Sequence, residues 1–368
     1  MKHRVYIYPL VVFLPLFLYG CASFGDPPSD EEIAQYNSKQ YNAEKKVFEN
    51  RRPGLVEAMQ ERVLNWEVMS DFFSGGDDRI PAEKLPEVKP DLAAFLEDSP
   101  HIKTIWFGHS SFLLNLGGTI ILIDPVFSDA ASPVSFMINR FQKPVLELEE
   151  LPRIDYVVIS HDHYDHLDMD TVKFFADKNT KFLTPLGIGS HLKSWDIKPD
   201  RIIEKDWWES ETLGGVEFVA TPAQHFSGRS GITGNKTLWA SWVIRTDKHS
   251  VYFSGDSGYD THFKQIGEKY GPFDVAFLES GQYNLKWREV HLMPEDAVEA
   301  YKDLNAKVYF PIHWGMFELS THPWYEPIER LFSFSEKKEI ELIAPKIGEL
   351  VHVGAPRGIE KWWEDVKR

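Results

Sequence analysis

Cysteine is almost absent from this chain of 368 residues, which contains only one. A single cysteine excludes a disulfide within the chain and any zinc site built from several thiolates. Basic residues are in the minority, with 40 Lys and Arg against 56 Asp and Glu, for a formal net charge of −16. This balance argues against nucleic acid as the main partner, because phosphate backbones are held by clusters of Lys and Arg. A bound metal would therefore need histidine and carboxylate ligands.

Internal repeats and low-complexity tracts are also missing. The main apolar run, residues 5–19, is shorter than the roughly 20 residues of a membrane span. This run follows a basic start and closes at Leu18-Tyr19-Gly20-Cys21, where the chain turns polar. The pattern resembles a bacterial lipobox, whose cysteine is lipidated and becomes the mature N-terminus. We expect residues 1–20 to be a signal peptide and Cys21 to anchor the protein in the cell envelope. Ala22 favours the outer membrane, and an ordinary signal peptide or a short anchor helix is the alternative.

Composition divides the remaining chain in two. Residues 21–100 carry scattered prolines and a polar stretch, which predict a linker and a helical lead-in with a surface helix over 55–73. From residue 101 onward, short β-rich runs alternate with loops and amphipathic stretches, which predict one α/β domain over 101–368. Helices are expected over 169–177 and 294–304. Strands are expected over 104–107, 111–116, 119–123, 156–159, 181–184, 216–220, 238–245, 251–253, 275–278, 307–310 and 341–344.

Histidines and aspartates crowd into one short motif directly after the predicted strand 156–159. The motif reads Ser160-His161-Asp162-His163-Tyr164-Asp165-His166. Imidazole and carboxylate are the ligands that zinc prefers when no thiolate is present. A solvated loop is the alternative interpretation, but this density of ligand-type residues after a buried strand favours a metal site.

Further candidate ligands follow other predicted strands. His225 comes after 216–220, Asp256 after 251–253 and His313 after 307–310. One edge of a sheet would then present five histidines and two aspartates, which suffice for two metal ions with open positions for water and substrate.

The spacing His161-x-His163-x-Asp165-His166, followed by His225, Asp256 and His313, resembles the metallo-β-lactamase superfamily. Surrounding segments resemble N-acyl-phosphatidylethanolamine-hydrolysing phospholipase D and its bacterial relatives. They include 106–109, 124–128, 206–209, 238–242, 255–259, 271–274 and 312–315, in order along about 101–355. The resemblance implies an αββα sandwich that holds two Zn²⁺ ions. It assigns His161, His163 and His225 to one ion, Asp165, His166 and His313 to the other, and Asp256 as a catalytic bridge between them.

Supporting roles are predicted for three more residues. Asp124, which ends the strand 119–123, is the candidate carboxylate that orients a ligand histidine, with a turn residue as the alternative. The resemblance places His291 near a substrate phosphate, as a catalytic and substrate-binding group. Arg229, four residues after His225, is a candidate phosphate ligand, and a plain solvated arginine is the alternative.

The resemblance implies a phosphodiester hydrolase that uses a hydroxide held between the two ions. Phospholipase D-type cleavage of an N-acylated phosphatidylethanolamine would suit a lipid-anchored enzyme at a membrane surface. A metal-dependent lactonase, or another metabolite hydrolase of the same fold, remains the alternative, as does an envelope lipoprotein that uses zinc structurally. An apolar groove beside the metals would favour the lipid enzyme, whereas an enclosed polar pocket would favour a metabolite hydrolase. The sequence leaves the oligomeric state open.

Overall fold

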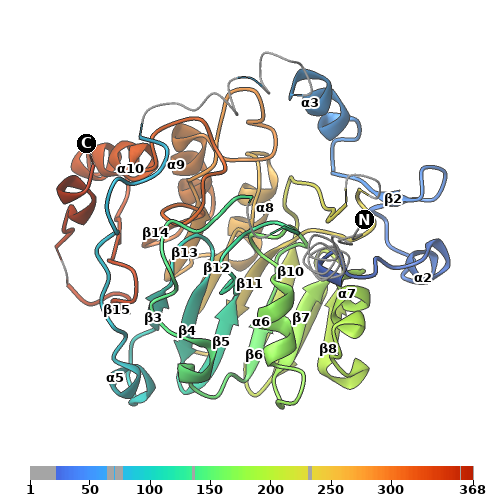
Figure 1. Cartoon of the computed structure of the whole chain (residues 1–368), viewed down its shortest axis with the longest axis horizontal. Coiled ribbons are helices and arrows are strands. Elements are labelled where there is room, and N and C mark those ends of the chain that lie inside the picture. The colour runs from blue at the N-terminus through green and yellow to red at the C-terminus, as the bar shows by residue number, and fades with distance from the viewer. Residues whose placement is uncertain are drawn as a thin grey trace, which may run out of the picture.

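Two β-sheets stacked face to face form the body of the computed structural model (Figure 1), which describes residues 22–63, 70, 78–134, 137–230, 234–356 and 358–367. The seven-stranded sheet has the order β15-β3-β4-β5-β6-β7-β8, and the six-stranded sheet the order β14-β13-β12-β11-β10-β9. Both are mixed: β5 to β8 run parallel, as do β12 to β14, and the other neighbours are antiparallel.

The strands of the seven-stranded sheet are β3 (Lys103–Trp106), β4 (Phe112–Leu116), β5 (Thr119–Ile123), β6 (Tyr156–Val158), β7 (Lys181–Pro185), β8 (Ile202–Lys205) and β15 (Leu350–His352). Those of the six-stranded sheet are β9 (Ser210–Leu213), β10 (Val216–Thr221), β11 (Ser241–Arg245), β12 (Ser250–Phe253), β13 (Val275–Glu279) and β14 (Tyr309–Ile312). A small hairpin pairs β1 (Tyr41–Asn42) with β2 (Val47–Phe48).

Strand residues alternate between two hydrophobic cores, as the two-residue period of a strand requires. On β4, Phe112 and Leu114 face the six-stranded sheet, where Phe112 stacks on Phe277 with ring centroids 4.1 Å apart. Leu113 points to the opposite side, into a second core with Val172 of α6. Because both faces are covered, the strands read as continuous apolar runs in the sequence.

Helices cover the outer faces of both sheets. Figure 1 shows α6 and α7 in front of the seven-stranded sheet and α8 and α9 behind the six-stranded one. The helices are α2 (Asp30–Gln35), α3 (Leu55–Val63), α5 (Leu92–Leu96), α6 (Met169–Phe174), α7 (Ile188–Ser194), α8 (His262–Tyr270), α9 (Pro294–Asp303) and α10 (Glu326–Glu336), with short 3₁₀ helices at Leu148–Glu150, Pro199–Arg201 and Trp362–Asp365. In the part of the chain that the structure describes, no helix is both long and apolar enough to cross a bilayer.

The predicted αββα sandwich is confirmed, although the sequence missed several elements at its margins. The expected strand over 341–344 is wrong, since only Leu342 forms an isolated bridge, to Tyr309. The edge strands β8, β9 and β15 were not predicted, and neither were α7, α8 and α10. Strand β9 shows the reason: its residues are exposed or half-buried, so it lacks the apolar run that marks the central strands.

The stretch predicted as a linker and lead-in packs against the body. Ile33 of α2 and Phe48 of β2 are fully buried in the larger hydrophobic core. Leu85 joins the same core, and Phe95 of α5 joins the second one. Many polar residues of this stretch are exposed, as a linker would have them, but Ser23, Asn50 and Arg79 are buried. The domain boundary at residue 101 stays a prediction.

Candidate metal centre

The loops that carry the predicted ligands meet at one edge of the sandwich, where the strands end. His161, His163, Asp165 and His166 follow β6, His225 follows β10, Asp256 follows β12 and His313 follows β14. We call this edge, with the buried side chains on it, the metal edge. The carboxyl ends of β5 and β6 in one sheet, and of β12, β13 and β14 in the other, place these loops together.

Three histidines form the first ligand group. His161 Nε2 lies 2.9 Å from His163 Nδ1, and His225 Nε2 lies 3.2 Å from the same atom. Ligand nitrogens of a tetrahedral zinc ion, each at about 2.0–2.1 Å from it, stand about 3.3 Å apart. The two distances to His163 are close to this spacing, and the three ligand atoms all lie within 4.8 Å of one another.

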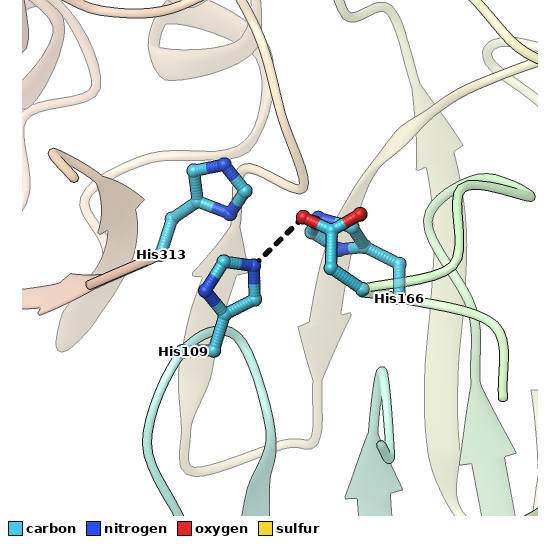
Figure 2. Close-up of side chains that lie close together, drawn as sticks. His109, His166 and His313 are labelled. Carbon is cyan, nitrogen blue, oxygen red and sulfur yellow. Dashed lines mark hydrogen bonds and ion pairs between the residues drawn. The ribbon is translucent and has the colours of Figure 1, made fainter. Parts of the chain in front are cut away.

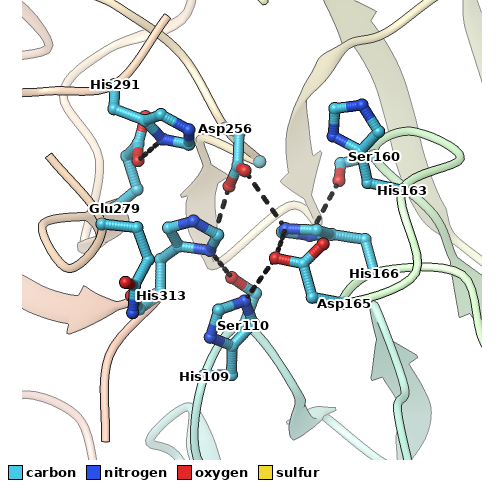
Figure 3. A network of polar contacts seen from close by, with 12 residues as sticks. His109, Ser110, Ser160, His163, Asp165, His166, Asp256, Glu279, His291 and His313 are labelled. Atoms are coloured by element: carbon cyan, nitrogen blue, oxygen red, sulfur yellow. Dashed lines mark hydrogen bonds and ion pairs between the residues drawn. The ribbon is translucent and has the colours of Figure 1, made fainter. Parts of the chain in front are cut away.

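Asp256 stands between this group and a second one (Figure 3). Its Oδ2 lies 3.2 Å from His166 Nε2, 3.7 Å from His225 Nε2 and 3.8 Å from His161 Nε2. Its Oδ1 lies 3.2 Å from His313 Nδ1. One carboxylate thus faces histidines of both predicted ligand sets. The structure brings all seven predicted ligands together, while the assignment of each to a particular ion stays a prediction.

The chemistry of this cluster fits bound cations. Burial lowers the pKa of His161, His225 and His313 well below the usual 6.5, so these imidazoles are neutral and offer lone pairs. His166 Nε2 and Asp256 Oδ1 are buried without a hydrogen-bond partner. Burial also disfavours a charge on His166, but the carboxylates around it outweigh that effect and raise its pKa well above 6.5. A positive charge is therefore favoured at the point where the side chains converge, as a metal site requires.

His109, which the sequence did not assign to the ligand set, lies inside the second group (Figure 2). Its Nε2 is 2.9 Å from Asp165 Oδ2, and its ring centroid is 4.2 Å from that of His313. The backbones of the two histidines also pair, because His313 N–H donates to His109 O and His109 N–H donates to Trp314 O. The sequence predicts only that His109, in the segment 106–109 that resembles the family, lies near the metal edge, and it gives no partner for this residue.

Asp124 occupies the place that the sequence predicted for it. Its Oδ2 lies 2.7 Å from His166 Nδ1, and its Oδ1 accepts a hydrogen bond of 2.7 Å from the backbone N–H of Ser160. The carboxylate therefore holds both the His166 ring and the start of the ligand loop. Ligand imidazoles commonly have such a partner on their second nitrogen, which fixes the ring orientation.

His291 lies at the same centre, beside the predicted ligands. Its ring is 5.1 Å from His225 and 5.3 Å from His313, and its Nδ1 is 2.8 Å from Glu279 Oε2. Burial alone would lower the pKa of His291, but attraction by Glu279 and the hydrogen bond to it raise that pKa to about 9. Glu279 ends β13 and directly follows the predicted strand 275–278, but the sequence analysis assigned it no role.

The role predicted for Arg229 is wrong. The side chain is only 5 % exposed, and its guanidinium donates to three backbone carbonyls, those of Ser23, Asp162 and Leu167. It also lies over the ring of Tyr164, at 4.0 Å. These contacts occupy the group that was expected to bind phosphate. Its position in a Gly/Ser loop concealed this burial from the sequence.

A cavity of about 350 Å³ opens beside the cluster. Five predicted ligands, His163, Asp165, His225, Asp256 and His313, line its floor together with His291 and Gln282. Its walls are apolar and come from segments far apart in the chain: Met59, Val63, Phe226, Trp287, Val290 and Leu319. Cys21, the predicted lipidation site, lies outside the described residues.

Comparison with known proteins agrees with this geometry. The model of the β-lactamase superfamily domain matches residues 119–314. The chain therefore belongs to the β-lactamase superfamily, and the buried His/Asp centre makes it a metal-dependent hydrolase of that superfamily.

Within the superfamily, the chain is similar to N-acyl-phosphatidylethanolamine-hydrolyzing phospholipase D 1 of Caenorhabditis elegans, with 38% identity over 80% of this chain and 88% of the relative. It is 41% identical to an uncharacterized protein of Mycobacterium tuberculosis over 82% and 81% of the two chains. Among solved structures, Igni18, a metallo hydrolase of Ignicoccus hospitalis, is similar with a TM-score of 0.54 and 25% identity, over 68% of this chain and 97% of that one.

Proposed function

We propose that the protein is a zinc-dependent phosphodiester hydrolase of the phospholipase D type that acts on N-acylated phosphatidylethanolamine or a similar lipid. Hydrolysis would break the bond between phosphorus and the head-group oxygen, and water would supply the hydroxyl group of the phosphatidic acid and the proton of the released N-acylethanolamine. The observation that supports this proposal most directly is the open cavity with apolar walls, whose floor is the metal cluster.

The cavity wall distinguishes a lipid from a small polar substrate. Met59 and Val63 come from α3, Phe226 follows His225, and Trp287 and Val290 belong to the loop before His291. Apolar side chains from three separate segments thus gather beside the metal cluster, where they can contact an acyl or glycerol chain while the phosphate reaches the floor. The similarity to the phospholipase of C. elegans supports the same substrate class.

Two zinc ions bound by the cluster would supply a hydroxide nucleophile at neutral pH and stabilise charge on the phosphate oxygens. The protein's own part is positioning. His291, held by Glu279 Oε2 at 2.8 Å, presents its ring beside His225 and His313. From there it can donate a hydrogen bond to a phosphate oxygen, the role that Arg229 cannot take.

We further propose that Cys21 carries a lipid and anchors the enzyme in the bacterial cell envelope, on the outer membrane. Ser23, two residues later, is fixed to the body by Arg229. Two residues of extended chain span about 7 Å, so a lipid on Cys21 would hold the catalytic body close to the membrane surface. An enzyme held in this way would meet its substrate without releasing it into water.

The substrate is tested by measuring zinc per chain together with the hydrolysis of N-acyl-phosphatidylethanolamine, a chromogenic phosphodiester and a lactone. We expect two zinc ions per chain and release of N-acylethanolamine. Opening of the lactone with neither phosphodiester cleaved would reject the phospholipase assignment and leave the metal-dependent hydrolase. The anchor is tested separately by mass spectrometry of the mature N-terminus, where an unmodified Cys21 would reject it.

A further inference from the structure

We propose that the N-terminal segment, residues 22–63, is a positioning element of the metal centre. It reaches the two loops that carry the three-histidine group, through a contact of Ser23 with Arg229 and a contact of Asn50 with His225. The family model matches residues 119–314, so this segment lies outside the matched region. The proposal depends on the metal centre and does not depend on the phospholipase assignment.

Arg229 joins the segment to the first ligand loop. Its Nε and one terminal nitrogen donate to Ser23 O, at 3.0 and 2.7 Å. The other terminal nitrogen donates to Asp162 O and Leu167 O, both at 2.7 Å. These two carbonyls lie on either side of His163 and His166 in the sequence, so one guanidinium holds both ends of the ligand loop. If Ser23 O were lost, two donors of a buried cation would lose their acceptor.

The main chain around Ser23 packs closely against the body of the protein. Trp195 Nε1 donates to Ala22 O at 2.9 Å, and the Arg229 guanidinium lies 5.0 Å from the centre of the Trp195 ring. Gly25 has a φ of +63°, and a Cβ there would come within 2.4 Å of His191 Nδ1. Only glycine fits this approach, so the sequence at 22–25 is adapted to the surface that it covers.

Asn50 joins the segment to the second ligand loop. Its Nδ2 donates to His225 O at 2.7 Å, and its Oδ1 accepts from His225 N–H at 3.1 Å. Trp239 Nε1 lies 3.2 Å from the same oxygen. The side chain is buried and holds the main chain of a predicted ligand by both of its polar groups. The His225 ring is held separately, with Nδ1 3.0 Å from Val290 O.

These two contacts connect the segment to the metal centre as well as to the fold. His161 and His163 come from one loop and His225 from the other, and their nitrogens must stay within about 3.3 Å of one another to share an ion. The same segment holds both loops by their main chains. Displacement of either contact changes the distance between the two loops, on which the three-histidine group depends.

The first test compares two buried asparagines. Asn50→Ala removes the contact with His225. Asn115→Ala is the matched control. Asn115 also donates to a carbonyl (Phe95 O, 2.7 Å) and accepts from an N–H (Gly118, 2.8 Å), but it lies near the end of β4 that is away from the metal centre. Zinc affinity is measured by competition with a chromophoric chelator, with thermal unfolding in parallel. We expect Asn50→Ala to weaken zinc binding by roughly tenfold to a hundredfold, and Asn115→Ala to lower stability alone.

The second test uses two buried arginines and remains informative if Asn50→Ala fails to fold. Arg229→Ala is compared with Arg201→Ala, whose guanidinium donates to Phe175 O and Ala176 O beyond α6, away from the metal edge. Added guanidinium ion should restore zinc affinity, and kcat rather than KM, in Arg229→Ala only. Zinc affinity that is unchanged in Asn50→Ala and Arg229→Ala, or lowered equally in their controls, would overturn the proposal whatever substrate the enzyme takes.

Discussion

The two edges of the sandwich bury polar side chains in opposite ways. At the edge away from the metal centre, which we call the far edge, several buried polar side chains donate to main-chain carbonyls. Lys103 donates to Ala94 O at 2.8 Å, Thr180 to Ile154 O at 2.8 Å, and Asn115 to Phe95 O at 2.7 Å. These bonds satisfy helix ends and loops, so the far edge contributes stability.

At the metal edge the buried polar side chains face one another. His166 Nε2, Asp256 Oδ1 and His109 Nδ1 have no hydrogen-bond partner. Three residues here, His109, Asp124 and His313, hold positive φ angles of 52°, 35° and 67°, which non-glycine residues rarely adopt. Unsatisfied polar atoms and strained backbone cost free energy and persist where function requires them. The comparison shows that one edge of the fold stabilises it and the other carries the chemistry.

Replacement of the Asp256 carboxylate should have the largest effect on the chemistry of the metal edge. Asp256→Asn keeps the size of the side chain and removes the charge that faces both ligand groups. We expect loss of at least one metal ion or of the spacing between ions, and a fall in turnover of several orders of magnitude, because the nucleophile depends on the ions. Metal content per chain and hydrolysis rate are measured together. A variant with full metal content and near-normal turnover would contradict the two-metal interpretation.

Asp124→Asn should have a smaller effect at the same edge. An asparagine tolerates the positive φ at this position, so the backbone can stay as it is. Its single oxygen can accept from Ser160 N–H or from His166, but the native carboxylate serves both. We expect metal affinity or turnover to fall by roughly tenfold to a hundredfold. Unchanged metal affinity would show that the His166 ring is fixed by its other contacts.

Much of the metal edge was predictable because its residues stand at strand ends in the sequence. The motif at 161–166 follows β6 directly, and Asp124, Asp256 and His313 each follow an apolar strand within three residues. Parallel strands bring their carboxyl ends together, so spacing along the chain became proximity in space. The αββα arrangement followed from the resemblance of the same segments to a known family.

The contacts that the sequence missed depend on tertiary packing alone. Arg229 follows the ligand His225 in a polar loop, and the sequence contains no sign that Ser23 O, 206 positions earlier, lies against it. Asn50 stands in a stretch whose polarity predicted a linker, and it holds His225 from 175 positions away. Glu279 stands at the end of β13, and its partner His291 follows 12 positions later in a loop. Long-range partners of a single buried polar group leave no local pattern.

At the far edge, Lys103→Met should affect stability and leave the metal centre intact. Methionine keeps much of the aliphatic stem but removes the ammonium that donates to Ala94 O and Glu97 O at the end of α5. Unmet buried carbonyls cost about 1–3 kcal/mol of unfolding free energy. Chemical denaturation should show this loss, and zinc content and kcat should match the wild type. A fall in zinc content would contradict the conclusion that the far edge stabilises the fold while the metal edge carries the chemistry.

His262 sharpens the comparison, because it lies behind the metal edge but is not part of the ligand cluster. It is fully buried at the start of α8, with its Nε2 3.1 Å from Ser257 Oγ. Burial, with repulsion by Arg51, lowers its pKa from 6.5 to about 3. The imidazole is therefore neutral in the folded state, whereas the unfolded chain binds a proton below pH 6.5. Stability from this residue is complete above pH 6.5 and falls as the pH drops toward 3.

We therefore expect His262→Phe, which cannot titrate, to flatten the pH dependence of stability. Between pH 7 and pH 5.5 the wild type should lose about 1 kcal/mol more unfolding free energy than the variant. Denaturation at both pH values measures this difference, in which the titration of the ligand histidines is common to both proteins and cancels. Equal losses would mean that His262 takes up its proton over the same pH range in the folded protein as in the unfolded chain, which would contradict the lowered pKa.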